Sequence, residues 1–271
     1  MINLLDDVKE QINNMFVADL KLDGTYQLNS IPGDALIINL HENINASILI
    51  NVNYTNKKII VNLDKNAQLD FNIASFDLDN ENQIEVNLDE NSEFNGAYAD
   101  FSSNCNKFKF TCNLNGTHSK ANWHLATLLK DSDLKSFEIS FYHNKRDTYA
   151  KMENYGVCED QSNLNFLGTS KINKGAKSSA THQSAKIMVF DKKCVAKASP
   201  TLCIDENDVQ ASHAAVVGQI NEDHIFYLMS RGIEEKEAKK LITLGYLMPI
   251  LNHFNDAETI NGIKDNIEKR V

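Results

Sequence analysis

The chain has 271 residues, of which 42% are hydrophobic and 24% charged, and it carries a formal net charge of −10 at pH 7. This composition supports a sizeable core and excludes general disorder, while the acidic balance argues against binding to nucleic acid or anionic lipid, which needs an excess of Lys and Arg. The N-terminus is acidic and no run of 18 apolar residues occurs in the sequence, so we expect a cytoplasmic protein without a signal peptide or membrane span.

The first predicted element is an amphipathic helix over residues 3–20. Its apolar residues recur at helical intervals: Leu4, Leu5, Val8, Ile12 and Phe16. We expect residues 1–29 to form this short N-terminal helix and a linker.

Short strands are predicted from about residue 34 onward. Their sequences are β-branched or aromatic and mostly alternate apolar with polar residues, as in residues 35–40, 48–54, 58–63, 69–78, 83–88 and 108–114. A similar phrase returns after several of them: "NLHENINAS", "NLDKNAQLD", "NLDENSEFN" and "NLNGTHSKA". The leucines of these phrases are Leu40, Leu63, Leu88 and Leu114, at steps of 23, 25 and 26 residues.

A repeat of this length predicts a mainly β solenoid, in which each coil buries its inner face by stacking on the next. We expect a parallel β-helix core over residues 30–220, with Asn and Asp turning the chain between strands. An antiparallel sandwich with regularly spaced turns is the alternative fold for the same pattern.

The C-terminal segment, residues 221–271, is predicted to form a helical subdomain. Asn221 is expected to cap a first helix that Gly232 ends, a longer helix follows from Glu234, and a last helix covers about 257–269. The longer helix has two apolar faces. The first contains Ala238, Leu241, Ile242, Gly245 and Met248, and the second contains Leu244, Leu247 and Leu251. Two apolar faces need two surfaces to bury them.

Motifs of common enzyme classes are missing from the sequence. It contains no G-x-G-x-x-G, G-x-S-x-G or H-E-x-x-H, and no C-x-x-C among its five cysteines. The stretch "GTSKINKGAKSS" has the residue types of a phosphate loop without the spacing. The templates for nucleotide binding, hydrolases and metalloproteases therefore fail, and no catalytic acid pair stands out among the many aspartates, although the motifs alone leave one open. We expect no stably bound cofactor.

The segment from Ser199 to Leu247 carries a dense family signature. Its elements are Pro200, Asp208-Val209, Ser212-His213, Phe226-Tyr227-Leu228, Ser230-Arg231-Gly232-Ile233 and Ala238. This arrangement resembles the C-terminal region of the SufB/SufD family of iron–sulfur cluster assembly proteins. The chain reads Ser-His-Ala-Ala where SufB usually reads Glu-His-Glu-Ala, which favours SufD.

The resemblance implies a right-handed parallel β-helix that acts as a non-catalytic scaffold of the SufBCD complex. It implies pairing with a SufB-like paralogue and docking of a SufC-like ATPase on the C-terminal helices, with a transient iron–sulfur cluster at the SufB/SufD interface. The implied interface residues are Ser212, His213 and Cys194, with His213 as a transient iron ligand. The residues implied for ATPase docking are Phe226, Tyr227, Arg231, Gly232, Leu244 and Leu247.

Several alternatives remain open from the residues themselves. His213 also fits a structural histidine, and Cys194 a small hydrophobic residue. Arg231 also fits helix capping. The isolated chain could form a homodimer. A stand-alone β-solenoid that binds or cleaves carbohydrate is the alternative function, although the sequence offers a single tryptophan, Trp123, for such a groove.

Overall fold

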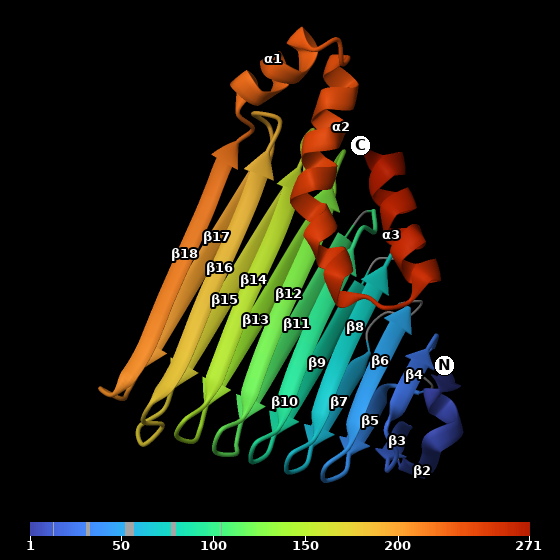
Figure 1. Ribbon diagram of the computed structural model, residues 1–271, viewed down its shortest axis with the longest axis vertical. Helices are drawn as coiled ribbons and strands as arrows, with labels where there is room; N and C mark the ends of the chain where they lie inside the picture. The colour runs from blue at the N-terminus through green and yellow to red at the C-terminus, as the bar shows by residue number, and fades with distance from the viewer. Residues whose placement is uncertain (13, 31–32, 52–56, 77–79, 104) are drawn as a thin grey trace.

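A computed structural model describes residues 1–12, 14–30, 33–51, 57–76, 80–103 and 105–271. Within these ranges the chain forms two nine-stranded sheets, here called sheet A and sheet B, that face each other along a solenoid (Figure 1). From β3 to β18, successive strands alternate between the two sheets. The expected parts of the strands at residues 52–54 and 77–78 lie outside the described residues.

The strands have the following bounds, in the order in which they lie in each sheet. Sheet A contains β1 (Ile2–Asn3), β4 (Gly24–Leu28), β6 (Asn45–Asn51), β8 (Gln68–Ser75), β10 (Glu93–Asp100), β12 (Lys120–Leu129), β14 (Tyr149–Cys158), β16 (Ser179–Val189) and β18 (Val209–Gln219). Sheet B contains β17 (Val195–Ile204), β15 (Asn163–Ile172), β13 (Leu134–His143), β11 (Cys105–Leu114), β9 (Asn80–Leu88), β7 (Lys58–Leu63), β5 (Ala35–Leu40), β3 (Met15–Leu20) and β2 (Val8–Ile12).

The repeating leucines stack in one column, as the sequence predicts. Leu40 lies in register with Leu63, Leu63 with Leu88, and Leu88 with Leu114, each time between parallel strands. All four side chains are buried. The parallel pairing confirms the solenoid and rules out the antiparallel sandwich; within the described ranges, antiparallel pairing joins β2 to β3.

The turns between strands explain the asparagine and aspartate content. Asn43, Asn66 and Asn91 occupy equivalent turns of successive coils and all have positive φ, between 57° and 63°. Asn and Asp tolerate this left-handed conformation better than most residues. The recurring N and D of the repeated phrases therefore mark the corners of the coils.

A ladder of amides runs across the outer face of sheet B. Asn39 donates to Asp19, Asn62 to Asn39, Asn87 to Asn62 and Asn113 to Asn87, over distances of 2.9 to 3.0 Å. Each side chain thus links its coil to the preceding one. The asparagine that precedes each leucine of the column therefore forms its hydrogen bonds outside the core.

Aromatic side chains fill the middle of the solenoid. Phe94 stacks on Phe110 with ring centroids 5.7 Å apart, and Phe110 stacks on Trp123 at 4.2 Å. Trp123 is fully buried. The single tryptophan is therefore a core residue and offers no surface for a carbohydrate.

The N-terminal segment differs from its prediction. Only Leu4–Asp7 are helical, as the 3-10 turn η1, and Met15–Leu20 form the first long strand of sheet B. The parallel coils therefore begin before residue 30, because β3 pairs with β5 and β4 pairs with β6. Residue 13 of the expected helix lies outside the described residues.

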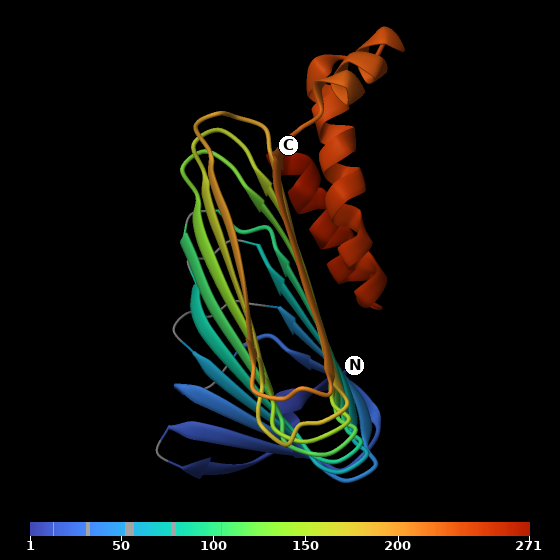
Figure 2. The ribbon, with the colours of Figure 1, turned by 90° about the vertical axis from the view of Figure 1, so that its left-hand side faces the viewer.

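Two of the C-terminal helices and the 3-10 helix between them lie against the outer face of sheet A, while the first helix projects beyond the ends of its strands (Figures 1 and 2). The helical elements are α1 (Glu222–Ser230), α2 (Glu235–Leu247), the 3-10 helix η2 (Met248–His253) and α3 (Ala257–Arg270). Asn221 caps α1 through its side chain, and Gly232 follows with a φ of 87°, as the sequence predicts.

A second apolar cluster joins these helices to the sheet. Ala126, Leu128 and Val157 of sheet A pack against Leu247, Ile250 and Phe254 of the helical segment and Ile263 and Ile267 of α3. Arg270 adds contacts to Asp133 and to the carbonyl oxygens of Phe101 and Ser102. Among the described helices, none is long and apolar enough to cross a membrane.

Candidate functional site

The solenoid is open at its C-terminal end. Within the described part of the chain, β18 pairs with β16 and β17 pairs with β15, and no strand continues either sheet. Their side chains are exposed or only partly covered, including Val195, Val216 and Val217, which are 44 to 56% exposed. We call the surface formed by β17 and β18 the open end.

Ser212 and His213 lie side by side on β18 but face opposite sides of sheet A. His213 is in register with Gln183, and Gln183 with Met152, in a row whose buried members point into the solenoid. Ser212 faces outward, where its Oγ lies 2.7 Å from His182 Nδ1. His213 therefore lies exposed over the end of the core, and its neighbours on the same face of β18 are the small residues Ala211 and Ala215.

Cys194 lies in the turn before β17, away from His213. Its Sγ is 3.6 Å from the carbonyl oxygen of Asp160 and 3.9 Å from Ser162 Oγ. This turn follows Val189, which pairs with Gln219, six residues along β18 from His213. At about 3.3 Å per residue, the two side chains are roughly 20 Å apart along the strand. The chain by itself does not bring Cys194 and His213 together.

The residues expected to dock an ATPase fall into two groups. Phe226 and Tyr227 project from α1 and are 73% and 56% exposed, and the Arg231 guanidinium lies 5.2 Å from the centre of the Tyr227 ring. Leu247 is buried and Leu244 partly buried, both within the cluster that joins the helices to sheet A. Both leucines contact the chain's own sheet, and this contact does not test binding of another protein. Docking through Leu244 and Leu247 therefore stays a prediction.

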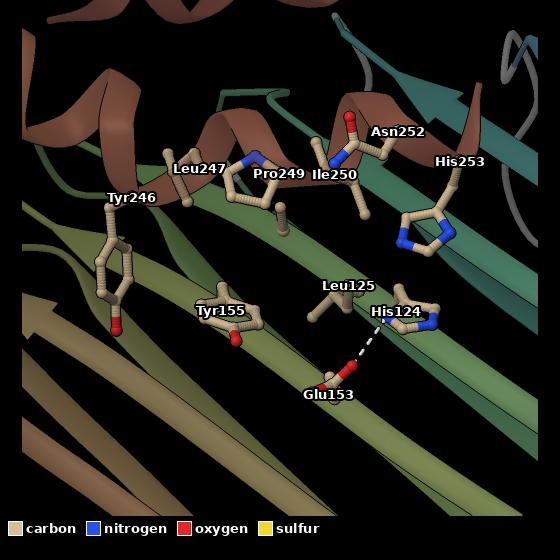
Figure 3. Close-up of a pocket in the computed structure, with 11 residues that line it drawn as sticks. His124, Leu125, Glu153, Tyr155, Tyr246, Leu247, Pro249, Ile250, Asn252 and His253 are labelled. Carbon is tan, nitrogen blue, oxygen red and sulfur yellow. Dashed lines mark ion pairs between the residues drawn. The ribbon is translucent and has the colours of Figure 1, made fainter. Parts of the chain in front are cut away.

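A pocket that the sequence did not predict lies between sheet A and the α2–η2 segment (Figure 3). It has a volume of about 170 Å³. Its lining residues are His124, Leu125, Ala126, Glu153, Tyr155, Tyr246, Leu247, Pro249, Ile250, Asn252 and His253. His124 comes from a strand and His253 from the end of η2, so no spacing rule in the sequence links them.

Two imidazoles stack at one end of this pocket. The rings of His124 and His253 are 3.9 Å apart between centroids, and His124 Nδ1 lies 3.3 Å from Glu153 Oε2 (Figure 3). Burial, followed by the neighbouring His253, lowers the pKa of His124 to about 4, against the opposing effect of Glu153. Burial also lowers the pKa of His253. Among the described residues, no group of three or more His, Cys, Asp and Glu side chains is arranged to hold a metal ion.

A third histidine is enclosed in the solenoid. His143 continues the leucine column, in register with Leu114, and its Nδ1 lies 2.8 Å from Thr148 Oγ1. Burial lowers its pKa to about 4. The imidazole is therefore neutral at pH 7, where it acts as a core residue.

These histidines predict a loss of stability in acid. The pKa values of His124 and His143 fall from 6.5 in the unfolded chain to about 4 in the folded one, so the unfolded chain binds protons first as the pH drops. The free energy of unfolding should be highest above pH 6.5. It should fall by roughly 3 kcal/mol for each histidine as the pH drops from 6.5 to about 4. Urea unfolding at pH 7, 5.5 and 4.5 measures it.

The His143→Leu variant is the matched control for this pH dependence. Leucine restores the residue type of the column and removes one of the histidines whose pKa is lowered by burial. The fall in the free energy of unfolding between pH 7 and pH 4.5 should be smaller in the variant than in the unchanged chain. Equal falls would contradict the assignment of His143.

Comparison with known proteins settles the family. A family model described as "SUF system FeS cluster assembly, SufBD core domain" matches residues 30–246. The chain belongs to the SufBD core family. The match covers the solenoid from β5 to β18 and extends through α1 into α2.

Curated relatives of this SufBD protein agree with the assignment. It is 31% identical over 165 residues to the iron–sulfur cluster assembly protein SufD of Bacillus subtilis. The aligned region covers 59% of this chain and 37% of that SufD. The chain is 35% identical over 115 residues to the SufBD family protein PH1385 of Pyrococcus horikoshii, covering 42% and 25%. The SufBD family protein Rv1461 of Mycobacterium tuberculosis is 26% identical over 137 residues, covering 51% and 16%.

The chain thus spans 37% of the length of the Bacillus subtilis relative and a smaller share of the other two. Their names describe iron–sulfur cluster assembly. Family membership confirms the resemblance drawn from the Ser199 to Leu247 signature.

Proposed function

We propose that this chain is a non-catalytic scaffold subunit of a cytoplasmic complex that assembles iron–sulfur clusters. In this proposal it pairs with a SufB-like paralogue through the open end and docks a SufC-like ATPase on its C-terminal helices. The observation that carries the proposal is the open end itself, in a chain of the SufBD family.

An uncovered pair of edge strands is suited to a second solenoid. The outer edges of β17 and β18 present backbone N–H and C=O groups, which another strand can pair with by continuing the sheet. Val217 on β18, in register with the buried Ile187, faces the solenoid interior and is 44% exposed. A partner that stacks a further coil here would bury this apolar cross-section along with the strand edges.

The position of His213 supports a role at such an interface. Its imidazole belongs to the inward-facing row at the open end, and the alanines beside it leave the ring uncovered. A neutral imidazole nitrogen binds iron, and the remaining ligands would come from the paralogue. The cluster is cargo in this proposal, held for transfer.

The exposed face of α1 supports docking of the ATPase. Phe226 and Tyr227 offer apolar area with an adjoining cation at Arg231, and aromatic and arginine side chains dominate the energy of protein interfaces. Because α2 packs on sheet A, a partner bound to α1 is linked mechanically to the solenoid.

Replacing His213 with Ala tests the role of the imidazole. We expect the complex of this chain with its SufB-like and SufC-like partners to form as before, while the yield of iron–sulfur cluster falls several-fold. Cluster yield is measured by visible absorption and by iron and sulfide content of the purified complex.

Gln210→Ala is the matched control, because Gln210 is an exposed residue of the same strand and lies two residues from Ser212, on the side that faces away from the solenoid interior. It should retain both the complex and the cluster. Unchanged cluster yield in His213→Ala would assign His213 a structural role, and loss of the complex would make it an interface residue. Failure of the unchanged chain to co-purify with a SufC-like ATPase would refute the scaffold proposal.

A further inference from the structure

A small void lies inside the solenoid directly behind strand β17. Its volume is about 10 Å³, counted as the space open to the centre of a water molecule. On this measure a cavity needs ~10 Å³ to hold one water. It is lined by Met152, Asn154, Phe166, Gly168, Gln183, Ser184, Ala185, Ser199 and Pro200. The lining contains no charged side chain.

Two amide oxygens of this lining have no hydrogen-bond partner. They are Asn154 Oδ1 and Gln183 Oε1, on side chains that are 2% and 5% exposed. A buried polar atom without a partner is destabilising, and such atoms are rare in folded proteins unless water reaches them. A molecule that carries two hydrogen-bond donors and fits the void would provide both oxygens with a partner.

The orientation of the Gln183 amide follows from its other contacts. Its Nε2 donates to the carbonyl oxygen of Thr201 at 3.1 Å and to Ser170 Oγ at 2.7 Å. A carbonyl oxygen only accepts hydrogen bonds, so the nitrogen must face Thr201. The oxygen Oε1 is thereby fixed on the opposite side of the amide, away from Thr201.

The residue at position 168 keeps this space open. A Cβ atom on Gly168 would lie 3.1 Å from Met152 Sδ and 3.2 Å from Gln183 Oε1, which is closer than side chains normally pack. A side chain at this position would therefore crowd Met152 and Gln183 Oε1 in the lining of the void. Glycine at this point of β15 is thus matched to a small occupant.

We propose that the void binds one ordered water molecule, which donates its two hydrogens to Asn154 Oδ1 and Gln183 Oε1. The hydrated Gln183 in turn holds β17 in place through Thr201. A water molecule has the required two donors and the required size, and a lining without charge gives a metal cation nothing to balance its charge.

The proposal deepens the proposed function, because β17 is one of the two edge strands of the open end. A strand that is fixed before a partner arrives loses less conformational freedom on pairing. The water site itself does not depend on that pairing, and it is tested on the isolated full chain.

The experiment counts long-lived internal waters by oxygen-17 magnetic relaxation dispersion. The unchanged chain should hold one more such water than the double variant Asn154→Leu/Gln183→Met, in which neither acceptor remains. Gly168→Ala is the second variant, since its methyl group enters the void while both amides stay. It should also lose one water. Gln210→Ala, at an exposed glutamine of β18, should lose none. Equal counts in the unchanged chain and Gly168→Ala, with both folded, would overturn the water site.

Hydrogen exchange tests the hold on β17. The Gln183→Met variant should exchange the amide protons of residues 201–203 about tenfold faster, the equivalent of one lost hydrogen bond, while those of residues 137–141 in β13 stay unchanged. Unchanged exchange in β17 would overturn its positioning by Gln183. Failure of either measurement leaves the pairing proposal intact, since both use the chain without its partners.

Discussion

Replacing Asp100 with Asn is expected to lower the free energy of unfolding by about 3–5 kcal/mol, because it removes the carboxylate that pairs with a buried lysine. Lys135 Nζ lies 3.2 Å from Asp100 Oδ1, and both side chains are fully enclosed in the solenoid. Burial lowers the pKa of Lys135, against the opposing effect of Asp100. Chemical denaturation at pH 7 measures the loss.

Lys135→Met is the control for the other half of this pair. Asp100 would keep hydrogen bonds from the backbone N–H and Oγ of Ser102 and from Asn106 Nδ2, so the cost should be smaller. Combining Asp100→Asn with Lys135→Met should recover most of the stability, since no buried charge then lacks a partner. A cost of less than about 1 kcal/mol for Asp100→Asn alone would contradict this account.

Replacing Leu247 with Asp is the second change with a large expected effect. Leu247 is 1% exposed within the cluster between the helices and sheet A, and an uncompensated carboxylate there should cost about 3 kcal/mol or more. We expect residues 235–270 to separate from the sheet while the solenoid stays folded. Hydrogen exchange should rise in α2 and α3 and remain slow in β11 and β13.

Phe226→Asp is the matched substitution on the exposed helix. Because Phe226 lies outside both apolar clusters, the variant should unfold at the same denaturant concentration as the unchanged chain. Under the proposed function it should nevertheless lose the ATPase. If Leu247→Asp left α2 and α3 protected, the packing of this helix on sheet A would be wrong.

The sequence predicted the solenoid because every coil repeats the same physical solution. Leu63 and Leu88 occupy equivalent positions in successive coils, and Asn66 and Asn91 occupy equivalent turns. The same sequence pattern therefore recurs often enough to be recognised as a repeat. The C-terminal helices were also predictable, since Asn221 and Gly232 mark the ends of α1.

The prediction of an N-terminal helix was wrong because the spacing of its apolar residues fits both a helix and a strand. Leu4, Val8, Ile12 and Phe16 are four residues apart, and a step of four is close to one helical turn but also a multiple of the strand period of two. Ala18 and Leu20 continue the even-numbered series and are buried in β3. Such a spacing alone does not distinguish the two structures.

The contacts that join distant segments were not predictable from the sequence. The stacking of His124 on His253 and the packing of Leu247 on sheet A depend on where the helical segment returns to the solenoid. Helical spacing marks Leu244 and Leu247 as one apolar face, but it does not say whether that face meets the chain itself or another protein. Likewise, Ser212 and His213 are adjacent in sequence, and only the register of β18 shows which of them faces the interior.

The amide ladder on sheet B gives the solenoid a direction and fixes the register of its strands. Every amide in it donates toward the N-terminus, so the series ends on the one residue that only accepts, the carboxylate of Asp19. Leu40, Leu63, Leu88 and Leu114 stay in register although 23, 25 and 26 residues separate them, so the ladder and the leucine column tolerate coils of different length. A slip of one residue within a strand would instead turn its ladder amide toward the core and its leucine toward the solvent.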